Sequence, residues 1–318
     1  MAKVLFLGCN NDQIPYLIAA QKLGFKVIGT DINPNALGAK LADRFHNVSY
    51  TDIDGLKQVA EIESWGGEDH VFTAAAHFAY EGASNLAAAL GLSFIRPDAV
   101  DTCLDKTKFY TLLKKYNVPV PPTNLYKVTN PAELDISKTY FLKSDYGKSP
   151  NYCYRIVNGQ IPKLPKEHDS FYRRHFLIQE EIRGTHYRVN IYAGRVSVFI
   201  KFSDTASTPI RVLGPGHEEV VNRLHKVVSA LGLENMLSKF DLIVNEESWY
   251  VIDIGLDPPM RFKLLCESLK IDFPSAYTRY YLLKDVSALP VWSDICSSVV
   301  IQGSPQQGFE FIKIGRGE

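Results

Sequence analysis

The chain has 318 residues, in which 35 Lys and Arg residues balance 35 Asp and Glu residues, and 46% of the residues are hydrophobic. This composition is typical of a globular protein with room for two or three packed units, and it excludes an intrinsically disordered chain. The balanced charge gives no reason to expect nucleic acid or a membrane surface as a partner.

The five cysteines are scattered, odd in number and never spaced as a metal-binding pair. A reduced compartment fits this usage best. The apolar run at 4–8 is too short for a signal peptide or a membrane span, and no later stretch approaches the length that a span needs. We therefore expect a cytoplasmic protein.

Strands and short helices alternate through the first part of the chain. Strands are predicted at 3–7, 26–30, 46–50, 70–75 and 92–96, and helices at 13–23, 36–42, 54–63 and 82–90. This alternation is typical of a parallel sheet with helices on both faces. We predict an α/β domain over roughly residues 1–95.

The pattern changes after Pro97. A helix is expected at 105–116, and the segment Val118-Pro119-Val120-Pro121-Pro122 then predicts an extended linker. Later strands are expected in pairs, at 139–143 with 152–157, 186–192 with 195–202 and 239–244 with 249–254, with a further strand at 176–182, a helix at 218–231, more helix through 283 and irregular structure beyond it. We predict that residues 96–318 are α+β with antiparallel sheet.

Four short segments hold the residues that could carry chemistry. In chain order they are Asp105-Lys106-Thr107-Lys108-Phe109 at a helix start, Phe141-Leu142-Lys143 at a strand end, Gln179-Glu180-Glu181-Ile182-Arg183-Gly184, and Lys239-Phe240-Asp241-Leu242 paired with Tyr250-Val251-Ile252-Asp253-Ile254. Together with the α/β unit in front, this ordered set resembles the ATP-grasp superfamily. Within it, the chain is most similar to the carboxylate–amine ligases of the N5-carboxyaminoimidazole ribonucleotide synthase and biotin carboxylase group. The resemblance covers residues 3 to about 261.

This resemblance implies an N-terminal parallel-sheet domain, an ATP-grasp domain over 96–318, and a lid at about 119–178 that closes over ATP. It implies an ATP- and Mg²⁺-dependent ligase that activates a small carboxylate as an acyl phosphate for attack by an amine or similar nucleophile. An acyl phosphate hydrolyses readily, so the lid would serve to exclude water. Mn²⁺ as an alternative metal and a homodimer are further expectations.

Lys106 and Lys143 match the two lysines of the family that contact the phosphates. The γ-phosphate must move onto a carboxylate that is itself negative, and cations between the two anions offset their repulsion. Lys201, Arg211 and Arg261 are further candidates for steadying that phosphate or the substrate carboxylate. Ordinary surface cations are the alternative interpretation of all five residues.

Asp241 and Asp253 match the two acidic metal ligands of the family. On neighbouring antiparallel strands they would share Mg²⁺ ions that bridge the phosphates; the alternative is that they cap strand ends. The family has a Glu-x-Asn pair where this chain has Asp253-Ile254-Gly255, and Gly255 has no side chain with which to bind a metal. Asp257 is the candidate to replace it, and the departure leaves weakened or lost activity open.

Glu180, Glu181 and Ile182 resemble the family's adenine-binding hinge. Backbone groups of Glu181 and Ile182 would read the base, and an acidic side chain would take its amino group. His186 falls where the family often has a glutamate for the ribose hydroxyls. An exposed charged edge is the alternative interpretation of the hinge segment.

Two loops complete the comparison with the family. The flap expected over the phosphates, at 144–151, keeps only Gly147, with Lys148 as an added charge. In the first loop of the chain, the dinucleotide fingerprint is absent because Asn10 stands at its second glycine. Gly8 would allow a ligand to approach, and His77 is either a substrate contact at the same edge or a plain loop histidine.

Three functions are therefore compatible with the sequence. The first is the ATP-dependent ligase, and the second is a non-catalytic ATP-binding protein of the same fold, suggested by Gly255 and the glycine-poor flap. The third is an NAD-dependent oxidoreductase. The sequence leaves open the carboxylate, the nucleophile and the oligomeric state.

Overall fold

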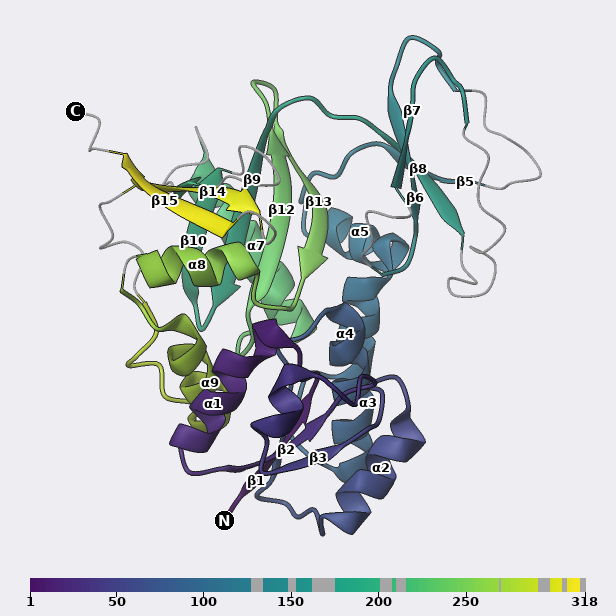
Figure 1. Cartoon of the computed structure of the whole chain (residues 1–318). Coiled ribbons are helices and arrows are strands. Elements are labelled where there is room, and N and C mark those ends of the chain that lie inside the picture. The colour runs from purple at the N-terminus through teal and green to yellow at the C-terminus, as the bar shows by residue number, and fades with distance from the viewer. Residues whose placement is uncertain are drawn as a thin grey trace.

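The computed structural model describes residues 1–126, 134–147, 153–161, 175–200, 208–209, 216–268, 270–290, 298–304 and 308–314. Within these ranges a parallel-sheet unit at the N-terminus is followed by antiparallel sheets and helices (Figure 1). The predicted fold class, α/β followed by α+β, is confirmed. No helix in these ranges combines the length and the apolar character needed to cross a membrane.

The N-terminal sheet has four parallel strands in the order β3-β2-β1-β4. The strands are β1 (Lys3–Leu7), β2 (Lys26–Thr30), β3 (Arg44–His46) and β4 (His70–Phe72), and the helices and 3₁₀ turns between them are η1 (Asn11–Gln13), α1 (Ile14–Lys22), η2 (Leu37–Lys40), α2 (Ile53–Ile62) and α3 (His77–Leu90). Apart from its first residue, each of β1 and β2 is buried throughout. Such continuous burial is expected of a parallel sheet with helices on both faces.

Several predicted elements of this unit differ from the structure. The strand predicted at 70–75 ends at Phe72. The strand predicted at 46–50 is misplaced: β3 covers Arg44–His46, and after it the side-chain amide of Asn47 donates to the carbonyls of Asp31 and Ile32 and turns the chain away from the sheet. The helix predicted at 36–42 is the four-residue 3₁₀ turn η2.

The strand predicted at 92–96 is wrong. Helix α3 is capped at its C-terminus by Gly91, which has a φ of +67°. The next helix, α4 (Pro97–Leu104), has Pro97 as its first residue. The short connection between the two helices buries Ile95 in the core without pairing to the sheet. An apolar run alone does not distinguish a strand from such a connection.

Helix α5 (Lys106–Lys115) confirms the helix predicted at 105–116. Asp105 separates it from α4, and its carboxylate accepts hydrogen bonds from the amides of Thr107 and Lys108 at 2.9 and 3.1 Å. This capping fixes where α5 begins and therefore where Lys106 stands.

A four-stranded antiparallel sheet follows α5, in the order β5-β8-β6-β7. Its strands are β5 (Thr123–Tyr126), β6 (Tyr140–Ser144), β7 (Cys153–Ile156) and β8 (Phe176–Glu180). Leu142, Ile156 and Ile178 give this sheet a small apolar core of its own. It occupies the range where the lid is expected, and closure over a nucleotide stays a prediction.

The second antiparallel sheet has the order β11-β10-β9-β12-β13. Its strands are β9 (Thr185–Tyr192), β10 (Arg195–Ile200), β11 (Thr208–Pro209), β12 (Ser238–Val244) and β13 (Trp249–Gly255), and α7 (His217–Leu231) lies between β11 and β12 in the chain. The predicted β9–β10 hairpin is confirmed, with Ala193 and Gly194 at φ of +50° and +70° in its turn. The predicted β12–β13 pair is also confirmed.

The C-terminal part contains α8 (Met260–Ser268), α9 (Phe273–Leu283), β14 (Ser298–Ser304) and β15 (Gly308–Ile314). The prediction of irregular structure after residue 283 is wrong, because β14 and β15 pair as an antiparallel hairpin. The alternation Phe309-Glu310-Phe311 is a strand signal that the sequence reading missed.

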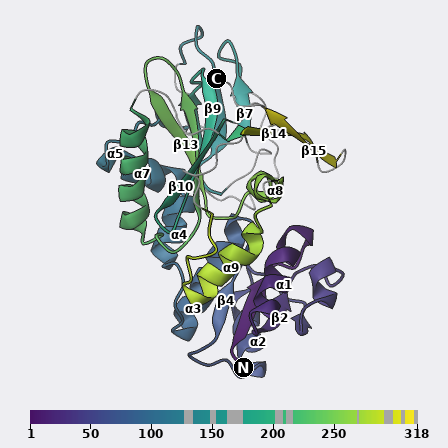
Figure 2. The same ribbon diagram turned by 90° about the vertical axis from the view of Figure 1, so that its left-hand side faces the viewer.

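Helix α9 lies beside α1 of the N-terminal unit, although the two are far apart in the sequence (Figure 2). Tyr281 donates a hydrogen bond to the carbonyl of Val71 at 2.8 Å. Tyr277 is fully buried, stacks on Phe273 with ring centroids 5.5 Å apart and meets Tyr16 edge-on at 6.4 Å. This aromatic cluster joins the N-terminal unit and α9 in one core.

We predict that Tyr277→Ala lowers the free energy of unfolding by about 3–5 kcal/mol, because it empties the centre of this cluster. Tyr277→Phe keeps the ring but removes the hydrogen bond from the Leu237 amide, at 3.2 Å, and should cost about 1 kcal/mol. Urea titration followed by circular dichroism measures both values. Equal losses in the two variants would contradict a packing role for the ring.

Candidate active site

Lys143 lies near the end of β6 and is held by two neighbours. Its Nζ donates to Tyr110 Oη at 2.9 Å and to Gln179 Oε1 at 2.7 Å. Burial lowers the pKa of Lys143, and the charge of Asp253 acts in the opposite direction. Within the described residues the third N–H of the ammonium group has no partner, so it is available to an anion.

Tyr110, on α5, connects this lysine to the strand that carries Asp253. Its hydroxyl donates to the carbonyl of Ile252 at 2.8 Å and accepts from Gln179 Nε2 at 3.1 Å. The carbonyl is accessible because of a β-bulge: Asp241 pairs with Asp253 but the next residue of β12 pairs with Val251, so Ile252 is skipped. Sequence reasoning missed both Tyr110 and Gln179, although a buried Gln in an apolar strand is a usable signal.

Lys106 is buried at the first position of α5. Its Nζ donates to the carbonyl of Gly147, and its own amide donates to the carbonyl of Asp145 at 2.7 Å. The amide of Gly147 in turn donates to the carbonyl of Leu104 at 2.8 Å. The backbone that follows β6 is therefore tied to the junction of α4 and α5, which brings Lys106 to the same end of the sheet as Lys143.

Arg188, Asp241 and Asp253 occupy one row across β9, β12 and β13, since each is paired directly with the next. Residues directly opposite each other in antiparallel strands point to the same face. The guanidinium of Arg188 holds Asp241 by two bonds, with Nε to Oδ1 at 2.7 Å and Nη2 to Oδ2 at 2.9 Å. Sequence reasoning did not identify Arg188.

The carboxyl group of Asp241 is therefore held in its charged form. Burial alone would raise its pKa, but the charge and hydrogen bonds of Arg188, together with the neighbouring His186, outweigh burial and hold this pKa well below its usual value. The Nε2 atom of His186 lies 3.4 Å from Asp241 Oδ1. The structure thus places His186 against the acidic row, whereas the sequence suggested a ribose contact.

The third predicted metal ligand, Asp257, also meets a cation of the protein. Lys239 is buried, and its Nζ lies 2.6 Å from Asp257 Oδ2. Asp253 makes neither an ion pair nor a hydrogen bond with any residue that the structure describes. In those same ranges, no three His, Cys, Asp or Glu side chains are grouped closely enough to hold a metal ion.

These groups converge around Tyr110. Burial raises the pKa of Tyr110, while the charge of Lys106 lowers it and that of Asp253 raises it. Lys143 is bonded to the same hydroxyl, and Asp241 is directly opposite Asp253. The structure therefore brings the two predicted lysines and the first two predicted aspartates together.

The predicted adenine hinge lies at the end of β8. The Glu180 carboxylate pairs with Lys138 at 2.9 Å, and the Glu181 carboxylate forms two bonds with Arg155 at 3.0 and 2.8 Å. The Glu181 amide donates to the carbonyl of Thr139 at 2.9 Å. In the described part of the chain the Ile182 amide has no hydrogen-bond partner. The hinge thus offers a backbone donor, while its acidic side chains already have cationic partners.

The other predicted site residues are less fully described. Lys201, Arg211 and Lys148 lie outside the described residues, and only the backbone is described for Arg261 in α8 and His77 at the start of α3.

Gly8 has a φ of +88°, and a Cβ at this position would lie 2.9 Å from that of Ala75. This glycine therefore serves the close approach of two loops. The Asp31 carboxylate accepts from the amides of Cys9 and Asn33, at 2.8 and 2.9 Å. It stabilises the loop and offers little to the ribose of a dinucleotide.

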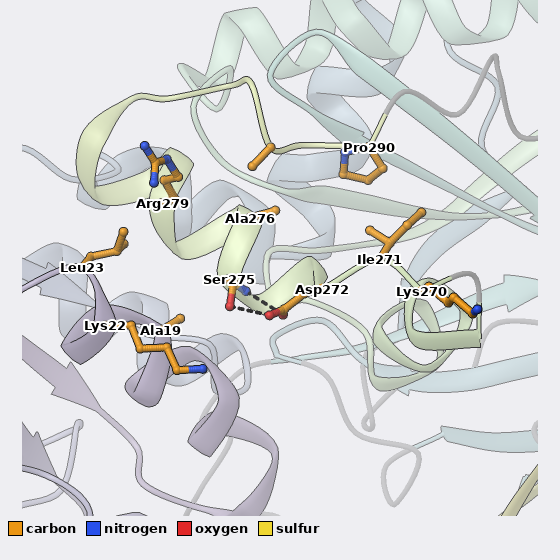
Figure 3. Close-up of a pocket in the computed structure, with 11 residues that line it drawn as sticks. Ala19, Lys22, Leu23, Lys270, Ile271, Asp272, Ser275, Ala276, Arg279 and Pro290 are labelled. Carbon is orange, nitrogen blue, oxygen red and sulfur yellow. Dashed lines mark hydrogen bonds between the residues drawn. The ribbon is translucent and has the colours of Figure 1, made fainter.

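A separate groove of about 650 Å³ lies between α1 and α9 (Figure 3). Lys22, Lys270 and Arg279 contribute its cationic groups, and Arg279 is already paired with Asp285. The residues that line this groove include none of the lysines or aspartates of the candidate active site.

Comparison with known proteins assigns the fold. A solved L-amino acid ligase from Bacillus licheniformis matches 96% of this chain and 81% of its own, with a TM-score of 0.72 and 18% identity. The N5-carboxyaminoimidazole ribonucleotide synthetase from Thermotoga maritima matches 95% of this chain and 80% of its own, with a TM-score of 0.67 and 15% identity. The biotin carboxylase domain of the 2-oxoglutarate carboxylase from Hydrogenobacter thermophilus, solved with MgADP and bicarbonate, matches 94% of this chain and 74% of its own, with a TM-score of 0.72 and 15% identity. The chain has the ATP-grasp fold.

Sequence comparison reaches a shorter segment. A formate-dependent phosphoribosylglycinamide formyltransferase from Shewanella frigidimarina is 39% identical over 61 residues, which are 19% of this chain and 15% of that enzyme. No family model matches the chain. The predicted ATP-grasp fold is therefore confirmed, and the roles of individual residues stay predictions.

The Arg188–Asp241 pair gives a prediction for acid stability. Because the pKa of Asp241 is depressed below its usual 3.8, the pair stabilises the fold above that pH and loses its contribution as the pH falls below it. We expect Asp241→Asn to cost about 3–5 kcal/mol at pH 7, since it leaves a buried guanidinium without its counter-charge. The difference from wild type should shrink as the pH falls below about 4. Urea titrations between pH 3 and 7 measure it.

The matched control is Asp54→Asn, which alters an exposed ion pair with Lys57. It should change the stability by less than about 1 kcal/mol at any pH. A pH-independent loss in Asp241→Asn would be inconsistent with the ion pair as the cause.

Proposed function

We propose that this chain is an ATP- and Mg²⁺-dependent ligase that activates a small carboxylate as an acyl phosphate for attack by an amine or similar nucleophile. The observation that supports it is the arrangement around Tyr110, where Lys106 and Lys143 meet the acidic row of Asp241 and Asp253. These two lysines and two aspartates suit a triphosphate that is bound by ammonium groups on one side and by a metal ion on the other.

The two lysines have different parts in this proposal. Lys143 is pre-oriented by Tyr110 and Gln179, so its remaining N–H points one fixed charge at a phosphate oxygen with little further ordering. At an effective dielectric constant of 20, one unit charge pair at 4 Å is worth about 4 kcal/mol. Lys106 donates to the carbonyl of Gly147 and adds a second positive charge at the same end of the sheet.

The metal proposal rests on the chemistry of the acidic row. Mg²⁺ is usually bound by one or two carboxylates together with phosphate oxygens and water, and Asp253 supplies a carboxylate on the face that Asp241 shares. When bound, the metal neutralises charge on the phosphates. Asp257 fits this role less well, because Lys239 already lies on its carboxylate. Mn²⁺ as a substitute stays a prediction.

For the nucleotide, we propose that the Ile182 amide reads the adenine edge and that Glu180 and Glu181 frame the hinge. An N5-carboxyaminoimidazole synthetase of this fold has been solved with ADP, which supports an adenine nucleotide as a ligand of this chain. Lys201, Arg211 and Arg261 remain proposed contacts of the transferring phosphate or the substrate carboxylate. The sheet β5-β8-β6-β7 is the proposed lid that excludes water.

The function is tested by measuring ADP release in the presence of Mg²⁺, ATP and a panel of amino acids and other small carboxylates, each with and without an amine. A ligase should release ADP only when a suitable carboxylate is present, and mass spectrometry should find the condensed product. Nucleotide binding with no turnover on any substrate would instead favour a non-catalytic ATP-binding protein, which the absent side chain at Gly255 suggests.

An NAD-dependent oxidoreductase is the third function. Because Asp31 is used by two backbone amides, we expect NAD(H) to leave the melting temperature unchanged and Mg²⁺-ATP to raise it. The reverse result would favour the oxidoreductase.

We predict that Lys143→Ala lowers kcat by about 10² or more, since the charge aimed at the phosphate is lost. The fold should persist, as judged by circular dichroism. Lys57→Ala, which removes an exposed lysine of α2, is the control and should retain wild-type turnover. A wild-type rate in Lys143→Ala would remove this residue from the mechanism.

We predict a comparable loss of kcat for Asp253→Asn (about 10² or more), because the amide is a poorer metal ligand than the carboxylate. This loss should be partly recovered at high Mg²⁺ concentration, which Lys143→Ala should not show. A Mg²⁺ titration of the ADP-release rate distinguishes the two variants. The same Mg²⁺ dependence in wild type and Asp253→Asn would argue against a metal at this residue.

A further inference from the structure

Asp241, Asp253 and Asp257 are the three predicted metal ligands of the candidate site. Two of them are already paired with a cation of the protein. Arg188 binds both oxygens of Asp241, at 2.7 and 2.9 Å, and Lys239 lies 2.6 Å from Asp257. Asp253, in the same row as Asp241, has no ion pair with a described residue. Among the described residues, Asp253 is therefore the one carboxylate of these three whose charge is not paired with a cation of the protein.

Arg188 is placed by the sheet and is poorly accessible. It stands opposite Asp241 in the register of β9 and β12, and its side chain is 16% exposed. A guanidinium stays charged at every pH relevant here and matches a carboxylate with two parallel bonds. The register also places Asp253 in the same row, directly opposite Asp241.

We propose that Arg188 takes the place of a second divalent cation, so that the nucleotide-bound site holds a single metal ion, on Asp253. A divalent ion on Asp241 would lie beside the guanidinium and be repelled by it, or would displace it and leave a buried charge unpaired. This inference rests on the proposed function, because it concerns the metal that accompanies the nucleotide.

The same inference accounts for the departure at Gly255. The family that this chain resembles has a side-chain ligand there, whereas Gly255 ends β13 opposite Lys239 without one. A site that holds one metal ion needs fewer protein ligands than a site that holds two.

The number of bound ions can be counted directly. Mn²⁺ is titrated into the protein with saturating ADP, free Mn²⁺ is followed by electron paramagnetic resonance, and bound ADP is measured by equilibrium dialysis. We expect one Mn²⁺ per bound ADP in the wild type. Two Mn²⁺ per bound ADP would overturn the inference and leave the proposed function standing. Absence of ADP binding would overturn the proposed function, and the inference with it.

Variants of Arg188 test the cause. Arg188→Met leaves Asp241 without its counter-charge, so this variant should bind two Mn²⁺ per bound ADP. The double variant Arg188→Met with Asp241→Asn should again bind one. Arg188→Lys keeps the charge and should hold one. Arg96→Met, which alters an exposed pair with Asp98, is the matched control and should also hold one.

If Arg188→Met fails to fold, the number of Mn²⁺ ions bound by the wild type and by Arg188→Lys still tests the proposal. Two ions in Arg188→Lys, or one ion in a folded Arg188→Met, would overturn the assignment of this role to the guanidinium.

Discussion

The hydroxyl group of Tyr110 is the constraint on which the arrangement of the site depends. It bonds to Lys143 from β6, Gln179 from β8 and the carbonyl of Ile252 from β13, three strands of two different sheets. Each partner is a buried or partly buried polar group that would be costly to leave unpaired. One helix residue therefore fixes the distance between the lysine of one sheet and the aspartate of the other.

The β-bulge at Ile252 makes this junction possible. A regular antiparallel pair would commit that carbonyl to the ladder or turn it away, whereas a bulge leaves the extra residue unpaired and bends the strand. Asp253 follows immediately, so the same irregularity that supplies the carbonyl also sets the direction of the carboxylate. Backbone geometry and charge placement are thus coupled at one residue.

Much of this could be predicted from the sequence, and for a definite reason. Lys106, Lys143, Asp241 and Asp253 each stand at a helix start or on an apolar strand, so local patterns locate them. Their order along the chain then suggested the fold, which the structural neighbours confirm.

The residues that the sequence did not reveal act across paired strands. Arg188 meets Asp241 only through the register of β9 and β12, and Tyr110 meets Ile252 only through the bulge. Register depends on long-range pairing, which one sequence does not display. The hairpin β14–β15 was missed for a different reason: its strands are adjacent in the sequence, but the connection between them lacks the commonest two-residue hairpin turn sequences.

The polar contacts of the proposed lid sheet are of two physically different kinds. Lys138–Glu180 and Arg155–Glu181 are ion pairs of exposed cations, which contribute little and are readily exchanged. The bonds among Lys143, Gln179 and Tyr110 are buried and expensive to break. The exposed pairs join segments of the sheet to one another, whereas the bonds to Tyr110 connect the sheet to α5. A closing motion of the whole sheet is therefore cheapest if it keeps the bonds to Tyr110. In that case a triphosphate adds a partner to Lys143 without replacing one, and the site is already ordered when the nucleotide arrives.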